Sequence, residues 1–142
     1  MKEFQKEYDR VFWSFFGIWL VFFAIISVWF KGAFFGFAIG ALTSYILHKI
    51  TTIFVSFRFK TRWFAYSLIS LKYFIFIVIV SLVLYGIWAI NSRIFTLKNY
   101  VNKLQLWTLP INIFTLCAGV GINYFIVFVQ YIYLKKKSKK RR

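Results

Sequence analysis

Four long apolar runs limit what this chain can fold into. Residues 11–30 form a stretch of about 20 residues without a charge, and further apolar runs cover 33–50, 73–90 and 109–134. An α-helix rises about 1.5 Å per residue, so about 20 residues cross the roughly 30 Å hydrocarbon layer of a bilayer. We therefore predict an all-α polytopic membrane protein whose four transmembrane helices form two hairpins.

The length and composition agree with a small membrane protein. The chain has 142 residues, of which 61% are hydrophobic and 15% are charged, whereas about a quarter of the residues of a soluble domain are usually charged. This length predicts a single membrane domain over residues 1–142. The one cysteine, Cys117, lies inside an apolar run, so we expect a buried thiol and no disulfide framework.

The positions of the basic residues predict the orientation in the membrane. Fifteen of the 19 Lys and Arg residues fall near the two termini or between the second and third runs, and four fall on the other side. The positive-inside rule then places both termini in the cytoplasm. Residues 50–72 have two interpretations: they extend the flanking helices beyond the membrane, or they lie in the headgroup layer.

Small residues occur at every fourth position at the start of the second run. These residues are Gly32, Gly36, Gly40 and Ser44, and on a helix they share an arc of about 120°. Helices in lipid associate by close packing, so a face of small residues indicates close helix–helix contact. The face contacts either another helix of this chain or a helix of a partner, which is another membrane protein or a second copy.

A stripe of polar and small residues follows one side of the fourth run. Its members are Asn112, Thr115, Gly119, Asn123 and Gln130. Buried amides need hydrogen-bond partners, so this side should face protein or water and not lipid. The stripe predicts either hydrogen bonds between helices or a polar pathway or partner contact. Pro110 is expected in the first turn of this helix, where proline is tolerated.

The remaining basic residues predict contacts with anionic lipid. We expect Lys72 to snorkel to the headgroups from the inner end of the third run, and His48 and Lys49 to do so from the second. The tail at 135–142 predicts contact with anionic headgroups or an acidic partner. Its cations are Lys135, Lys136, Lys137, Lys139, Lys140, Arg141 and Arg142. Nucleic acid is disfavoured as a partner because the cations flank apolar runs.

The distribution of acidic residues argues against catalysis. The only three, Glu3, Glu7 and Asp9, lie in the first nine residues. General acid–base chemistry normally recruits a carboxylate, a histidine or a tuned lysine in a cleft, and a transition metal needs three or four ligands. We therefore predict no enzymatic activity, cofactor or metal. Proton-coupled transport is disfavoured because no predicted span carries an acidic residue.

Three segments are similar to the ATP synthase protein I family of small four-span bacterial membrane proteins. They are GFAIGALTSYI at 36–46, SLKYFIFIVIVSLVLY at 70–85 and LPINIFTLCAGVGINYFIVFV at 109–129. The resemblance implies an assembly factor of the bacterial plasma membrane that helps the rotor-ring subunits of a rotary F-type ATP synthase to assemble. It also implies that the small-residue face, within 32–44, contacts a rotor subunit. A role in divalent-cation uptake is a second implication.

A pore is the alternative function predicted from the same residues. Self-association through the small-residue face, with the stripe around Asn123 lining water, would give a holin-like oligomeric pore or a passive ion transporter. The two functions differ in their partners. Assembly requires the rotor subunit, whereas a pore requires further copies of this chain and conducts ions.

Overall fold

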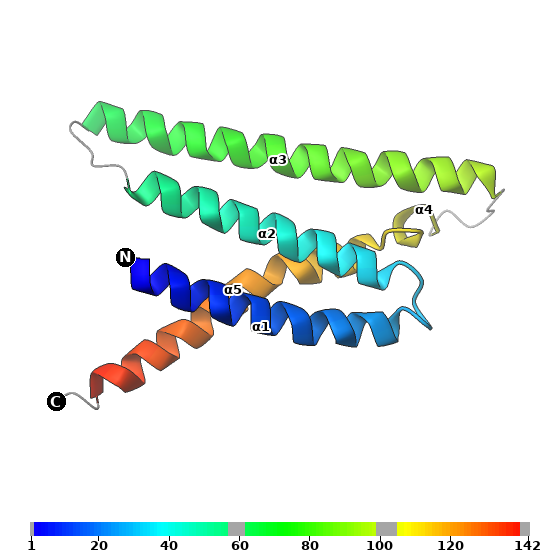
Figure 1. Ribbon diagram of the computed structural model, residues 1–142. Helices are drawn as coiled ribbons and strands as arrows, with labels where there is room; N and C mark the ends of the chain where they lie inside the picture. Colours follow the sequence, from blue (N-terminus) through cyan, green and yellow to red (C-terminus); the bar gives the residue numbers. More distant parts are fainter. Residues whose placement is uncertain (1, 57–61, 99–104, 140–142) are drawn as a thin grey trace.

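The structure is a computed structural model that describes residues 2–56, 62–98 and 105–139. Over these residues it contains helices and no strand (Figure 1), namely α1 (Lys2–Ile26), α2 (Ala33–Ser56), α3 (Arg62–Leu97), α4 (Gln105–Thr108) and α5 (Ile113–Lys139). The four long helices, α1, α2, α3 and α5, are each long and apolar enough to cross a membrane. The predicted all-α class and the four candidate spans of a multi-pass membrane protein are confirmed.

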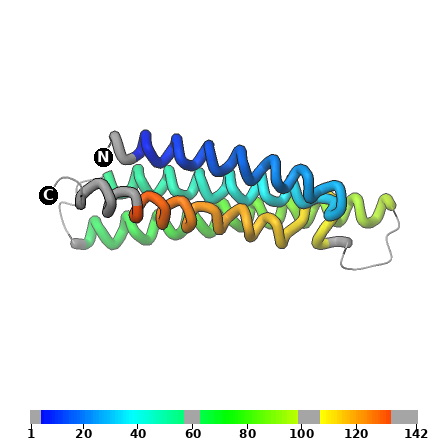
Figure 2. Tube along the Cα trace, turned by 90° about the horizontal axis from the view of Figure 1, so that it is seen from below, coloured from blue at the N-terminus to red at the C-terminus, as the bar shows by residue number. Residues whose placement is uncertain are grey.

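The long helices lie side by side, and α2 occupies the middle of the bundle (Figures 1 and 2). Helix α2 packs most closely against α5 and also contacts α1 and α3. Helix α3 lies at the edge, where it contacts α2 and the short α4. The start of α1 and the end of α5 lie at the same end of the bundle. Neighbours in space therefore differ from neighbours in the chain, because the main partner of α5 is α2.

Helices α2 and α3 are longer than their apolar runs. Helix α3 has 36 residues, which corresponds to about 54 Å at 1.5 Å per residue and exceeds the roughly 30 Å of the hydrocarbon layer. Helix α2 continues to Ser56 and α3 begins at Arg62. The described parts of 50–72 therefore continue the two helices. At its other end α3 runs past the predicted boundary at residue 90 to Leu97.

A turn at residues 27–32 connects α1 to α2, and Gly32 is its last residue. Gly32 has a φ of 84°, a left-handed conformation that glycine adopts without a steric cost. Its carbonyl oxygen accepts hydrogen bonds from the amides of Gly36 and Asn112, each at 3.1 Å. The prediction that Gly32 belongs to the helical small-residue face is therefore wrong, because α2 begins one residue later.

Asn112 caps the start of α5. Its Oδ1 accepts hydrogen bonds from the amides of Phe114 at 2.9 Å and Thr115 at 3.4 Å, which is the bonding pattern of an N-cap. The Thr115 hydroxyl donates to the Asn112 carbonyl at 2.9 Å. Pro110 precedes this cap, so the prediction that it lies in the first turn of the helix is wrong.

Two apolar clusters hold the bundle together. The first joins α1, α2 and α5, and its buried residues are Tyr8, Phe12, Phe37, Ala41, Ile122 and Ile126. The second joins α3 to α2 and the start of α5, and it contains Ile87, Ile111 and Leu116, with Ile39 and Val83 packed against them. Dense van der Waals contact of this kind is a principal source of helix association in lipid.

Candidate functional site

The small-residue face of α2 lies against the backbone of α5. A Cβ added to Gly36 would collide with the carbonyl oxygen of Asn112, and a Cβ added to Gly40 would collide with that of Leu116. Helix α5 contributes Gly119, where an added Cβ would lie 2.7 Å from the Ala41 amide nitrogen. The glycines therefore let the two backbones touch, the arrangement that small residues allow in membrane helices.

Ser44 adds a hydrogen bond to this α2–α5 contact. Its hydroxyl donates to the carbonyl oxygen of Val120 at 3.0 Å, and bonds of this kind between membrane helices contribute about 0.6–2 kcal/mol. Of the two interpretations of the small-residue face, contact with a helix of the same chain describes this structure. A partner helix could reach Gly36, Gly40 and Ser44 only by displacing α5.

Most residues of the polar stripe of α5 make separate contacts within the chain. Asn112 and Thr115 form the cap, and Gly119 contacts α2. Asn123 accepts a hydrogen bond from the Tyr8 hydroxyl of α1. Gln130 is buried, with 6% of its surface exposed, and neither of its amide atoms has a hydrogen-bond partner among the described residues. The stripe therefore faces protein, and the side-chain oxygen of Asn123 is hydrogen-bonded to Tyr8.

Gln130 and Asn123 should respond oppositely to substitution by leucine. Leaving a buried amide unpaired costs about 1–3 kcal/mol, so we expect Gln130→Leu to raise the free energy of unfolding by about 1 kcal/mol. Asn123→Leu should lower it by a similar amount, because it leaves the buried Tyr8 hydroxyl without its acceptor. Unfolding of each purified variant by sodium dodecyl sulfate in mixed micelles would measure both changes. Equal losses of stability would contradict the assignment of Gln130 as unpaired.

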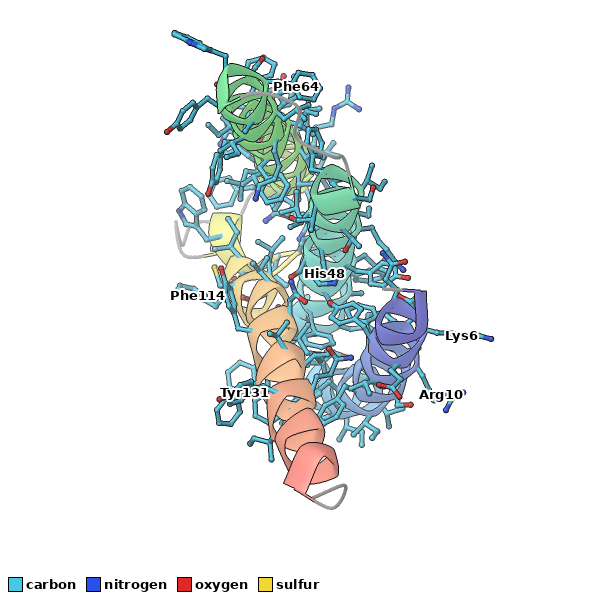
Figure 3. The ribbon with its side chains drawn as sticks, turned by 90° about the vertical axis from the view of Figure 1, so that its left-hand side faces the viewer. Lys6, Arg10, His48, Phe64, Phe114 and Tyr131 are labelled. Carbon is cyan, nitrogen blue, oxygen red and sulfur yellow. The ribbon has the colours of Figure 1, made fainter. Side chains whose placement is uncertain are left out.

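A polar cluster between α1 and α2 was not predicted from the sequence. The Tyr8 ring is 1% exposed and stacks on the imidazole of His48, with 3.8 Å between ring centroids. The Asp9 carboxylate lies 2.6 Å from Lys49 Nζ and accepts a hydrogen bond from the Tyr45 hydroxyl at 3.0 Å. Figure 3 shows this end of the bundle, where Lys6 and Arg10 point outward from α1. The cluster joins the two helices at the end where the termini lie.

This cluster corrects the prediction for Lys49. Its ammonium group pairs with Asp9 and does not simply extend to the headgroups. The reason is that α1 begins at Lys2, well before the predicted span at 11–30. Asp9 therefore belongs to this helix and lies beside α2. Tyr8 and Phe12 are both buried. Their helical spacing of four residues is the sequence signal that the helix continues before residue 11.

Asn91 positions the segment that leads into α5. Its side chain is 1% exposed, its Nδ2 donates to the Ile111 carbonyl at 2.9 Å, and its Oδ1 accepts from the Ile111 amide at 3.1 Å. One side-chain amide thus forms hydrogen bonds with both the backbone amide and the backbone carbonyl of Ile111, a buried residue outside the helices. Left unpaired, these two buried groups would destabilise the fold. Asn91 was not predicted as a site residue, because it directly follows the apolar run 73–90 and nothing in the sequence indicates that Ile111 lies beside it.

The predicted lipid-contact residues are only partly described. Lys72 Nζ lies 4.9 Å from the ring centroid of Tyr73 and 5.5 Å from that of Phe76, within the range of cation–π attraction. The seven tail cations, Lys135, Lys136, Lys137, Lys139, Lys140, Arg141 and Arg142, lie outside the described residues and side chains. Cys117 is exposed on α5, so the expectation of a buried thiol is wrong.

The described contacts are those of helix packing. They comprise backbone contact at glycines, single hydrogen bonds between helices and one ion pair. The described residues include no group of three His, Cys, Asp or Glu side chains that could hold a metal ion. Comparisons with protein families, curated proteins and solved structures find no match to this chain.

Proposed function

We propose that this protein is a non-catalytic accessory protein of the bacterial plasma membrane that helps to assemble the rotor ring of a rotary F-type ATP synthase through helix–helix contacts. In this proposal both termini lie in the cytoplasm, as the distribution of basic residues favours. The chain crosses the membrane as two successive hairpins, α1–α2 and α3–α5. The observation that carries the proposal is an exposed stripe on α3.

This docking stripe consists of exposed residues spaced alternately four and three apart. Its members are Phe74, Val78, Ser81, Tyr85 and Trp88. At about 100° per residue they lie on the side of α3 opposite Val83 and Ile87, which pack against the rest of the bundle. Alternating steps of three and four residues are the spacing by which one helix packs along another. The stripe therefore has the geometry of a surface for a further transmembrane helix.

Ser81 favours a helix over lipid alone as the neighbour of this stripe. The residue is exposed near the middle of the most apolar of the four candidate spans. Its hydroxyl has no hydrogen-bond partner within the described part of the chain. Lipid tails offer no hydrogen bond, whereas a neighbouring helix can offer one. A partner helix at Ser81 would therefore gain packing and a polar contact together.

The resemblance to the ATP synthase protein I family provides the candidate partner. One of the similar segments, 70–85, includes most of the docking stripe. The rotor subunits are themselves glycine-rich helical hairpins, whose small residues would fit against the large side chains of the stripe. Because α5 covers Gly36 and Gly40, the proposed contact lies on α3 and not on the second span.

Site-specific cross-linking in native membranes tests this function. A photoreactive amino acid at position 81 should form a cross-link to the rotor subunit, identified by mass spectrometry. Ser81→Leu should reduce co-purification of that subunit by about threefold or more, the effect of one hydrogen bond between membrane helices. The same photoreactive group at Val21, which is exposed on α1, is the matched control and should give no such product.

Two results would contradict the proposal in different ways. Equal capture of the rotor subunit from positions 21 and 81, or capture from neither, would exclude a docking stripe on α3. Cross-linking of position 81 to a second copy of the chain alone would replace assembly by self-association. Ion flux through liposomes containing the purified protein would then be the next measurement for the pore.

A further inference from the structure

An open pocket lies at the end of the bundle farthest from the chain termini. It has a volume of about 340 Å³ and is formed by the turn before α2, the end of α3 and the segment before α5. Phe35, Ile94, Leu97 and Leu109 form apolar walls, and Lys31 and Lys98 contribute cations. An apolar pocket with two cations matches a ligand that is part hydrocarbon and part anion.

Hydrogen bonds to backbone groups hold the walls of this pocket in place. The Asn112 amide donates to the Gly32 carbonyl at 3.1 Å, which ties the start of α5 to the turn. The two Asn91 hydrogen bonds to Ile111 tie the same segment to α3. A Cβ at Gly32 would lie 2.5 Å from the carbonyl oxygens of Thr108 and Pro110, so the turn and the segment are in close contact. The pocket is therefore formed before a ligand arrives.

The two cations at this pocket have no counter-charge among the described residues. Lys31 and Lys98 are exposed, and neither forms an ion pair with any described residue. All three acidic side chains of the chain lie within residues 3–9, at the start of α1, which is the opposite end of the bundle. An anion from outside the chain therefore meets no competing carboxylate among the described residues at this end.

We propose that this pocket binds one anionic phospholipid, with its phosphate between Lys31 and Lys98 and an acyl chain along Phe35 and Ile94. Both apolar residues belong to helices that are long and apolar enough to span a membrane, and the two lysines lie at the ends of those helices. Lys31 lies between the apolar runs 11–30 and 33–50, so the pocket opens at the depth where headgroups meet hydrocarbon. The site lies in the leaflet opposite the chain termini and does not depend on the identity of the helix that contacts α3.

Native mass spectrometry of the full-length protein in detergent can test this site. The probes are phosphatidylglycerol and phosphatidylcholine with identical acyl chains. The wild type should retain one phosphatidylglycerol with a preference of about 10- to 30-fold over phosphatidylcholine, as expected for two cations near a membrane surface. The double variant Lys31→Gln with Lys98→Gln should lose most of this preference, and Lys31→Arg with Lys98→Arg should keep it.

Arg93→Gln is the matched control, because Arg93 lies on the same end of α3 but does not line the pocket. It should leave the preference within about twofold of the wild type. A wild type that binds both lipids equally would overturn the proposal. So would a double glutamine variant that keeps the preference, or an Arg93→Gln variant that loses as much of it. The last result would indicate diffuse attraction to positive charge and not a defined site.

Discussion

Gly40→Ala should lower the free energy of unfolding by about 3 kcal/mol or more. The added methyl group would collide with the Leu116 carbonyl oxygen of α5, a backbone atom that cannot move aside as a side chain can. Overpacking in a closely packed interface typically costs about 1–3 kcal/mol, and more where the obstacle is rigid. Helix α5 would have to move away from α2, which would also weaken the Ser44–Val120 hydrogen bond. Unfolding by sodium dodecyl sulfate in mixed micelles, followed by circular dichroism, would measure the loss.

Gly17→Ala and Gly86→Ala are matched controls for this experiment. Both glycines lie in long helices, and beyond the adjacent backbone of the same helix a Cβ at either position would meet no atom within 4 Å. Alanine favours a helix over glycine by about 1 kcal/mol, so these variants should be as stable as the wild type or slightly more stable. If all three alanine variants lost similar stability, backbone contact at Gly40 would not be the cause.

Asn91→Leu should lower the free energy of unfolding by about 2–5 kcal/mol. Leucine has a similar size, but it would leave both the amide and the carbonyl of buried Ile111 without a partner. Each unpaired buried group costs about 1–3 kcal/mol. The same unfolding titration measures this loss. The substitution should also loosen the segment before α5, which faster amide hydrogen exchange near Ile111 would reveal.

Thr96→Val is the matched control for Asn91. Thr96 is exposed on the same helix, and within the described residues its hydroxyl donates only to the Ser92 carbonyl of that helix, at 3.0 Å. We expect a change within about 0.5 kcal/mol, as is usual for surface positions. A loss for Asn91→Leu no larger than that of this control would show that the two hydrogen bonds to Ile111 contribute little.

The spans were predictable because the bilayer sets a simple requirement. Each run of about 20 apolar residues can cross the membrane only as a helix, and α1, α2, α3 and α5 each overlap one of the four runs, although α1 ends at Ile26 and not at residue 30. Their ends were less predictable. Hydropathy does not report that α3 continues through Ser92 and Arg93, because polar residues outside the hydrocarbon layer are as compatible with a helix as with a loop.

The neighbour of each helix face could not be predicted from the sequence. Gly36 and Gly40 indicate close packing, but lipid tails are as apolar as leucine, so composition does not distinguish a face covered by protein from one covered by lipid. The Asp9–Lys49 ion pair required knowing that α1 extends beyond its apolar run and lies beside α2. The role of Asn91 required knowing that Ile111, 20 residues away in the sequence, lies next to it.

The α2–α5 contact also has a consequence for the order of events during synthesis. Ser44 and its partner Val120 are 76 residues apart, and ribosomes add about 5–20 residues per second. Helix α2 would thus wait roughly 4–15 s in the membrane before α5 is made. During this interval Gly36 and Gly40 are open to any helix nearby, including one from another nascent protein. Once α5 is made, it covers Gly36 and Gly40. In a chain that stops before residue 113, the two glycines would stay exposed to other helices.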